Sequence, residues 1–245
     1  MEAGYGSPDT AVALIRTARR SSGTVLLEGV HALKHALRFG ATIELVATSD
    51  PDTVLALVAE LAPDLHPEVA GRLVTLDAGA WDRAVPRALP SPVVAVARRP
   101  LLDAADVLAT EGPVVVLEQP RHLGNVGAVI RVAAAADAGG VLVVGDADPW
   151  HPTAIRGAAG LQFALPVART DALAATDRPV IALDGDGDPT GGLPADGLLL
   201  VGTERGGLSP ALAARATATM ALPMRPGVSS LNLATAVAVA LYRGR

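Results

Sequence analysis

Short apolar runs alternate with alanine-rich stretches along the second half of the chain. Four nearly continuous aliphatic runs predict buried strands, at residues 114–117, 141–144, 180–183 and 198–201. Stretches with helical spacing accompany them at residues 126–138 and 210–218. Strands that alternate with helices are typical of a parallel sheet with crossover helices, so the expected fold class is α/β.

The first half of the chain repeats this alternation more weakly. It predicts strands at 25–27, 43–47, 72–76 and 93–97 and helices at 29–39 and 52–61. A polar join marked by prolines follows at residues 98–113. We therefore expect a small α/β domain at residues 1–105, which opens with a helix or tail at 1–20, and a second domain at 106–245.

The composition mainly excludes certain kinds of site and certain classes of protein. The chain has 245 residues, of which 50% are hydrophobic and none is cysteine, which excludes disulfide bonds, a thiol nucleophile and cysteine-bound zinc. No apolar run reaches the length of a membrane span, and the amino terminus lacks the apolar core of a signal peptide. The expectation is a soluble cytoplasmic protein with no membrane partner.

Two further counts bear on partners and metals. The chain carries 20 basic and 25 acidic residues, and a net charge of −5 speaks against a nucleic-acid partner. His31 and His35 are four residues apart but have no evident third ligand, so no metal site is expected there. Asp184, Asp186 and Asp188 alternate as in a calcium loop but lack the rest of that pattern.

Three polar segments are the candidates for chemistry. The first runs from Gly124 to Arg131, follows a buried strand and opens a helix that Asn125 can cap. It lacks the third glycine of a dinucleotide-binding turn and the lysine of a Walker loop. Taken alone, this segment is more typical of an ordinary helix cap.

The second and third segments lie near the end of the chain. Gly202 to Gly207 follows a buried strand, at the edge where open α/β sheets bind ligands, and its glycines flank Glu204. The alternative is an ordinary turn into the helix at Pro210. Residues 222–232 lead into an apolar terminal helix, which belongs to the core or to an interface.

In order and spacing, the three segments together resemble the motifs of the SpoU/TrmH family of RNA ribose 2′-O-methyltransferases, in the SPOUT superfamily. The first motif is matched by Asn125, Gly127 and Arg131, the second by Gly202, Glu204 and Gly207, and the third by Leu222–Met224 with Ser230–Asn232. The likeness covers residues 111–245, and residues 27–33 resemble the family's amino-terminal substrate-binding domain more weakly. The departures from the family pattern are Thr203, Leu222 and Ala158.

The resemblance implies a fold, an assembly and a cofactor. The family fold is an α/β trefoil knot in the carboxyl-terminal domain, and its members form homodimers through that domain and the last helix. The implied cofactor is S-adenosylmethionine, held mainly by backbone groups at the knot loops. The matching cofactor-binding positions are Gly202, Thr203, Gly207, Leu222, Met224 and Leu231.

The resemblance also implies catalytic roles. The matching residues are Arg131, Asn125, Glu204, Ser230 and Asn232. Family proposals make the first-motif arginine a base that acts with an RNA phosphate. The pKa of an ordinary arginine lies far above neutral pH, which makes it a poor base, so holding the phosphate and polarising the hydroxyl is the other open role.

The partner implied by the resemblance is RNA, despite the net charge. Ribosomal RNA is preferred, because an amino-terminal extension is commoner in the members that modify it. Binding then needs a local basic face, for which the candidates are Arg16, Arg19, Arg20, Lys34, Arg38 and Arg156. The alternatives are a transfer-RNA 2′-O-methyltransferase, a non-catalytic RNA-binding relative, and a dinucleotide-dependent enzyme whose characteristic turn is absent.

Overall fold

The computed structural model describes residues 7–203 and 206–243, in two compact units, Met1–Leu101 and Leu102–Arg245. The division falls just before helix α6 (Ala104–Leu108), which packs against strands β6 and β7 of the second unit. The sequence placed the boundary inside this helix. A capping box between Asp103 and Asp106 begins the helix at a point that the polar composition of the join does not reveal.

The first unit has a four-stranded sheet in the order β1-β4-β2-β3. Its strands are β1 (Thr24–Glu28), β2 (Ile43–Thr48), β3 (Leu73–Thr75) and β4 (Val93–Arg98). Strand β4 runs antiparallel to β1 and β2, whereas β2 and β3 are parallel. The helices are α1 (Pro8–Ala18), α2 (Val30–Arg38), α3 (Pro51–Leu61), α4 (His66–Arg72) and α5 (Ala78–Ala84), with a 3-10 turn at Pro63–Leu65.

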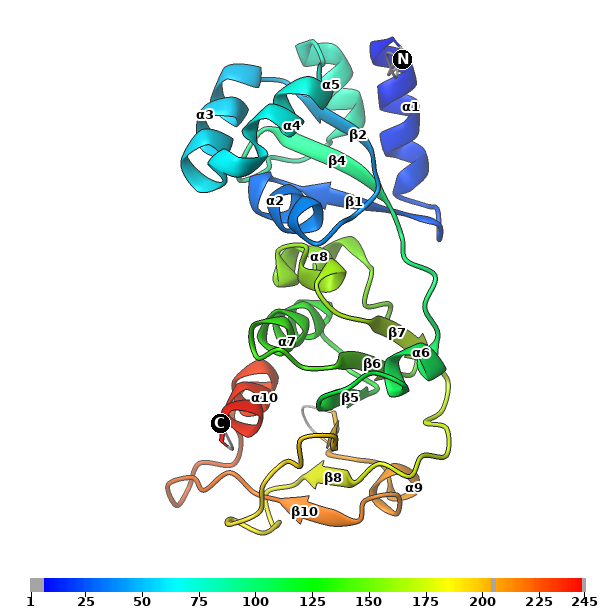
Figure 1. Ribbon diagram of the computed structural model, residues 1–245, viewed down its shortest axis with the longest axis vertical. Helices are drawn as coiled ribbons and strands as arrows, with labels where there is room; N and C mark the ends of the chain where they lie inside the picture. Colours follow the sequence, from blue (N-terminus) through cyan, green and yellow to red (C-terminus); the bar gives the residue numbers. More distant parts are fainter. Residues whose placement is uncertain (1–6, 204–205, 244–245) are drawn as a thin grey trace. The chain divides into compact units, whose positions relative to one another are not determined.

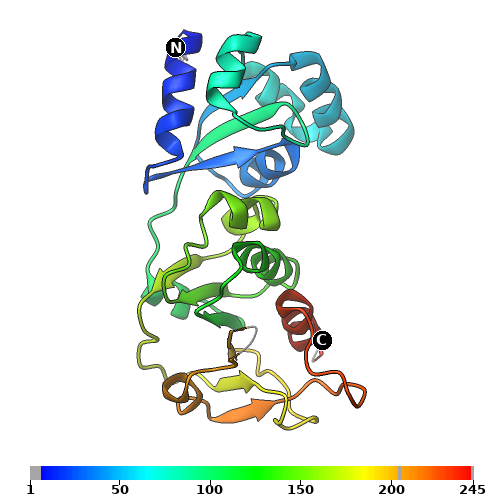
Figure 2. The ribbon, with the colours of Figure 1, turned by 180° about the vertical axis from the view of Figure 1, so that it is seen from behind.

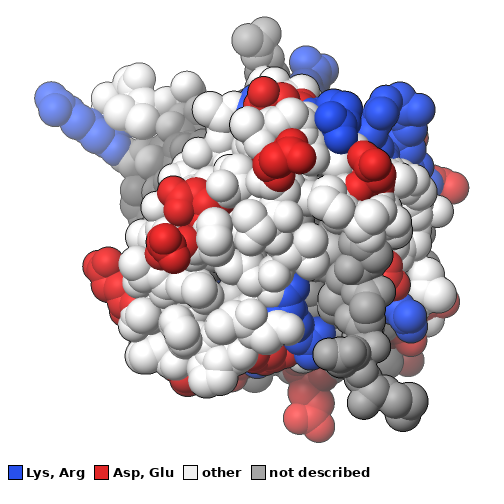
Figure 3. Space-filling model, turned by 90° about the horizontal axis from the view of Figure 1, so that it is seen from above, with Lys and Arg blue, Asp and Glu red and all other residues white. Residues whose placement is uncertain are grey.

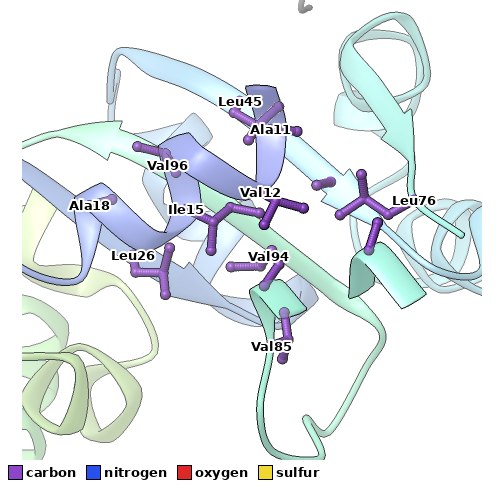
Figure 4. Close-up of a cluster of buried hydrophobic side chains, with 13 residues drawn as sticks. Ala11, Val12, Ile15, Ala18, Leu26, Leu45, Leu76, Val85, Val94 and Val96 are labelled. Carbon is purple, nitrogen blue, oxygen red and sulfur yellow. The ribbon is translucent and has the colours of Figure 1, made fainter. Parts of the chain in front are cut away.

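Helices α1 and α5 cover one face of this sheet, and the core between them is apolar (Figure 4). Val12 and Ile15 of α1 pack over Leu26, Val94 and Val96, which alternate along their strands and so point to the same face. Helices α2, α3 and α4 lie on the other face (Figure 1). Of the helix or tail expected at residues 1–20, the structure therefore has a helix, over Pro8–Ala18.

The second unit has a parallel six-stranded sheet in the order β10-β8-β9-β5-β6-β7. Its strands are β5 (Val114–Glu118), β6 (Gly140–Val144), β7 (Val167–Thr170), β8 (Val180–Leu183), β9 (Leu198–Val201) and β10 (Ala218–Met220). The α/β class and the parallel sheet are confirmed. Strand order reverses between β5 and β9, and ligands of open α/β sheets bind beyond the carboxyl ends of strands at such a point.

The helices of this unit are α6, α7 (Leu123–Ala135), α8 (Pro152–Ala158), α9 (Pro210–Ala213) and α10 (Leu233–Tyr242), with a 3-10 turn at Leu161–Phe163. The predicted helix at 210–218 is wrong in its second part, because α9 ends at Ala213 and β10 begins at Ala218. Thr217 explains the change: its backbone N–H donates to the carbonyl of Val180 at 2.8 Å, which starts pairing with β8. Alanine-rich composition alone does not reveal this pairing.

Helix α7 packs between α8 and α10, and α7 and α10 lie side by side in both views (Figures 1 and 2). Gly127 permits the close approach to α8, since a Cβ atom there would lie 2.1 Å from the carbonyl oxygen of Ala154. Gly127 of the first segment thus allows α7 and α8 to pack closely. None of the helices in the described part of the chain is long and apolar enough to cross a membrane.

Candidate active site

A cavity of about 170 Å³ lies beyond the carboxyl ends of three neighbouring strands, β10, β8 and β9. The residues that directly follow these strands form much of its wall. Its lining comprises Leu183, Asp184, Gly185, Val201, Gly202, Thr203, Gly207, Leu222, Met224, Ser229, Ser230, Leu231, Leu233 and Ala236. Residues far apart in the sequence thus meet at the ligand-binding edge of the sheet.

The loop after β9 folds back on itself at Thr203 and Gly207. The two residues exchange backbone hydrogen bonds, at 3.0 Å from Thr203 N to Gly207 O and 3.2 Å from Gly207 N to Thr203 O. A Cβ atom on Gly202 would lie 2.1 Å from the carbonyl carbon of Gly207, so the turn requires glycine at position 202. Glu204, predicted to be catalytic, lies outside the described residues.

The far end of this loop is fixed to the neighbouring strand β5. Glu118 ends β5 and is only 9% exposed. Its carboxylate accepts hydrogen bonds from the backbone N–H of Ser209 at 2.7 Å and from the Ser209 hydroxyl at 2.5 Å. Both carboxylate oxygens are thereby engaged, and the loop is held at both ends.

The first and third segments meet at the start of α10. The side-chain oxygen of Asn232 accepts from the N–H of Ala234 at 2.9 Å and so caps this helix. Its amide group donates to the side-chain oxygen of Asn125 at 3.3 Å. Asn232 is thus both the cap of α10 and a link between α10 and α7.

The predicted site residues divide into two groups. The six predicted cofactor-binding residues and Ser230 all line the cavity, and Asn125 and Asn232 bond to each other next to it. Arg131 stands apart, on the exposed face of α7. It lies six residues beyond Asn125, roughly 120° around a helix of ~3.6 residues per turn, so the two side chains do not share a face.

Sequence reasoning missed several residues of the cavity wall. Asp184 and Gly185 line it, whereas the sequence draws attention to Asp184 only as part of an incomplete calcium-loop pattern. Their position directly after the buried strand Val180–Leu183 is the signal that would have identified them. Ser229, beside the predicted Ser230, also lines the cavity.

The family model described as "SpoU rRNA Methylase family" matches residues 112–242. This chain belongs to the SpoU rRNA methylase family. The matched range contains all the strands of the second unit and every residue of the cavity wall.

Individual SpoU relatives extend the likeness over the whole chain. The 23S rRNA (uridine(2479)-2′-O)-methyltransferase of Streptomyces viridochromogenes is 28% identical over 253 residues, which cover 93% of this chain and 84% of the relative. The 23S rRNA (guanosine(2553)-2′-O)-methyltransferase RlmP of Bacillus subtilis is 28% identical over 239 residues, with coverage of 93% and 90%.

A solved structure agrees with this assignment. The crystal structure of the SpoU methyltransferase AviRb from Streptomyces viridochromogenes, in complex with the cofactor AdoMet, superposes with a TM-score of 0.75. The two sequences are 27% identical, and the match covers 94% of this chain and 93% of AviRb. Both units of this SpoU chain therefore have counterparts in that structure.

The predicted RNA-binding residues of this SpoU chain fall into separate groups. Arg16, Arg19 and Arg20 line a hollow at the end of α1. Lys34 and Arg38 lie on α2, across the sheet from α1, and Arg156 lies on α8 of the other unit. Seen from above, the surface is largely uncharged, with acidic and basic side chains interspersed (Figure 3).

Two of these arginines have partners within the first unit. Arg19 approaches the buried carboxylate of Glu28 at 3.5 Å and donates to the carbonyl of Ala84 at 3.1 Å. Arg38 bonds to Asp64 at 2.7 Å, and this hydrogen bond lowers the pKa of the Asp64 carboxyl and raises that of the guanidinium. These contacts engage Arg19 and Arg38 within the first unit, and RNA binding by these residues stays a prediction.

Proposed function

We propose that this protein is an S-adenosylmethionine-dependent methyltransferase that methylates a ribose 2′-hydroxyl of ribosomal RNA and acts in the cytoplasm. The observation that carries the proposal is the convergence of the second and third segments on one cavity, with the Asn125–Asn232 bond beside it. The named activities of the 23S rRNA methyltransferases that cover most of this chain support the same substrate class.

The cavity wall fits S-adenosylmethionine. Leu222, Met224 and Leu231 supply an apolar surface for a flat adenine ring, and the folded-back loop at Gly202 leaves backbone groups accessible beside it. Asp184 contributes a carboxylate, which suits hydroxyl groups of a ribose. When bound, the cofactor supplies a methyl group on a positively charged sulfur atom.

The chain's own residues then have to orient the RNA and polarise the 2′-hydroxyl, whose proton leaves to water as its oxygen takes the methyl group from the sulfur. Ser230 and the linked amides of Asn125 and Asn232 lie at or beside the cavity and offer hydrogen bonds to a ribose. Arg131 holds an RNA phosphate and polarises the 2′-hydroxyl, since a planar, positively charged guanidinium binds phosphate well and accepts protons poorly. Glu204 keeps the catalytic role that the second motif implies.

The homodimer is part of the same proposal. Val239 and Tyr242 of α10 are 44% and 49% exposed, and the Tyr242 hydroxyl donates to the carbonyl of Ala135 on α7 at 3.0 Å. These exposed side chains of α10 offer an apolar contact that a second copy would cover. Arg131 lies on the same exposed side of α7 as Ala135, so we propose that it completes the site of the partner copy.

The first unit binds RNA in this proposal. Arg16 and Arg20 at the end of α1 are exposed, and Lys34 lies on α2. A few such contacts suffice for salt-dependent binding despite the net charge of −5. The trefoil knot of the second unit stays a prediction of the family resemblance.

The experiment that tests the function has two steps. Calorimetry measures binding of S-adenosylmethionine to the purified protein, and labelled methyl transfer is then measured on unmodified transcripts of 23S rRNA and of transfer RNA. We expect transfer to 23S rRNA, with 2′-O-methylation at a single nucleotide. Cofactor binding without transfer to either RNA would contradict the enzymatic proposal, and transfer to transfer RNA alone would contradict the ribosomal substrate.

A further inference from the structure

A second hollow lies beside the cofactor cavity, beyond the carboxyl ends of β5 and β6. It has a volume of about 570 Å³, and the residues that follow these two strands form its wall, among them Gln119, Arg121, Asp148 and His151. Thr203 lines both this hollow and the cofactor cavity. We call it the β5–β6 pocket, and whatever occupies it lies next to the occupant of the cavity.

The lining of the β5–β6 pocket contains a strained residue. Gln119 has φ = 43°, in the left-handed region that a residue with a side chain rarely adopts. A Cβ atom on the neighbouring Gly145 would lie 2.5–2.7 Å from the amide atoms of Gln119, so position 145 requires glycine to leave room for this side chain. Strain of this kind persists where the surrounding structure enforces it, and it is concentrated at ligand sites.

The wall of the pocket presents oriented polar groups. Nδ1 of His151 accepts a hydrogen bond from the N–H of Thr153 at 3.1 Å, so a neutral His151 ring carries its proton on Nε2. Asp148 is held by the N–H of Trp150 at 3.1 Å. Arg121 is exposed and forms no ion pair with another residue of the described ranges 7–203 and 206–243.

We infer that the β5–β6 pocket receives the RNA nucleotide that is methylated, an inference that rests on the proposed function. The Gln119 amide and the His151 Nε2–H offer planar donors and acceptors, which match the edge of an unstacked nucleobase. Arg121 supplies a positive charge for a flanking phosphate. With the base in this pocket, the ribose lies at the border with the cavity that Thr203 marks, within reach of Ser230 and beside the cofactor, as transfer of a methyl group to a 2′-oxygen requires.

Two substitutions separate this role from a structural one. Gln119→Gly removes the amide and relieves the positive φ, so the protein keeps or gains thermal stability. His151→Asn keeps a side-chain acceptor for the cap of α8 but removes the imidazole edge. We expect the double variant to raise KM for a 23S rRNA transcript by about tenfold or more, with the Kd for S-adenosylmethionine unchanged.

His66→Asn is the matched control, because it makes the same change at the start of another short helix, α4, in the first unit. It leaves both KM and Kd at their wild-type values. A folded double variant with an unchanged KM for RNA overturns the inference while the proposed function stands. A wild-type protein that transfers no methyl group to RNA overturns both.

A second measurement does not depend on the stability of any variant. The chain has five histidines, so their ring signals can be assigned by NMR and followed while each of the four nucleoside 5′-monophosphates is added. We expect the His151 signal to shift with one nucleotide in preference to the others, while the His66 signal stays in place. A titration that leaves His151 unmoved, or moves His66 equally, overturns the nucleotide subsite.

Discussion

Glu118 receives two hydrogen bonds from Ser209, a residue 91 positions further along the chain. The contact joins the end of β5 to the end of the loop that contains Gly202 and Gly207. The Ser209 hydroxyl in turn accepts from the N–H of Leu212 at 3.2 Å and caps α9. A buried carboxylate therefore fixes one wall of the cofactor cavity through its position, without lining the cavity itself.

Replacing this carboxylate should weaken cofactor binding. Glu118→Gln keeps the shape of the side chain but loses the charge-assisted bonds to Ser209, so we expect a loss of about 1–3 kcal/mol in the free energy of unfolding. With the loop released, the Kd for S-adenosylmethionine rises by about tenfold, measured by calorimetry. Glu111→Gln, at an exposed position, is the control. An unchanged Kd in a folded Glu118→Gln protein would show that the contact stabilises the fold only.

A substitution at Asn232 can remove its hydrogen bond to Asn125 while keeping its role as the cap of α10. Asn232→Asp retains an oxygen that caps α10 but removes the amide that donates to Asn125. We expect the free energy of unfolding to change by less than about 0.5 kcal/mol, because aspartate caps helices as well as asparagine does. The rate of methyl transfer falls by about a hundredfold, since the ribose loses its alignment.

Asn232→Ala is the companion variant for this prediction. It loses both functions and should cost about 1 kcal/mol in stability in addition to the loss of activity. Denaturant unfolding and single-turnover transfer to 23S rRNA measure the two effects. If the aspartate variant transfers methyl groups at the wild-type rate, the Asn125–Asn232 bond has no part in the reaction.

The sequence predicts those elements whose hydrophobic pattern lies within one unbroken run of residues. The buried strands of the second unit come from runs such as Leu198–Val201, which carry their own pattern, whereas cavity residues such as Leu222–Met224 were singled out by the family resemblance. The contacts that could not be predicted join distant segments. Neither the Glu118–Ser209 bond nor the place of Asp184 in the cavity wall has a local pattern, because each depends on the order of strands in the sheet.

Several short elements were not predicted from the sequence, for a related reason. Helices α4 and α5 and strand β10 are each of seven residues or fewer, too short for a period to stand out. Their formation depends on tertiary contacts, as where Val85 and Ala84 at the end of α5 pack against α1 and the sheet. The sequence therefore predicted the strands of the second unit better than the short helices α4 and α5 of the first.

Arg131 provides a test of both its role and the dimer. Arg131→Ala should abolish methyl transfer while calorimetry still detects cofactor binding, because the side chain is exposed and does not line the cavity. Arg131→Lys keeps the charge but loses the planar fork that binds phosphate, so it recovers only part of the rate. Transfer at a near wild-type rate in Arg131→Ala would contradict the assignment.

Mixed dimers show whether Arg131 acts in the site of its own copy or in that of the partner copy. When Arg131→Ala protein is mixed with Asn232→Asp protein, a dimer containing one copy of each has one intact site only if Arg131 acts across the interface. We expect such dimers to regain up to about half of the wild-type activity, as one of two symmetry-related sites is restored. If subunit exchange is verified and the mixed dimers still show no methyl-transfer activity, Arg131 acts in the site of its own copy.

The exposed side chains of α10 test the interface directly. Val239→Asp puts a charge on the apolar surface, and burying an unpaired carboxylate in a dimer is unfavourable. Light scattering should therefore report a dimer for the wild-type protein and a monomer for Val239→Asp. Leu101→Asp, at a position that is 90% exposed, should leave the dimer intact. A monomeric wild-type protein would contradict the proposed assembly.

Neighbouring arginines at the end of α1 should behave differently when removed. Arg19→Ala leaves the buried Glu28 with one fewer partner and should cost about 1–3 kcal/mol of stability, the range in which a partly screened buried contact falls. Arg20→Ala removes an exposed charge, so stability changes by less than about 0.5 kcal/mol. If the first unit binds RNA here, Arg20→Ala also lowers the slope of log K against log salt concentration by about 1. An unchanged salt slope in Arg20→Ala would exclude this end of α1 from the RNA-binding surface.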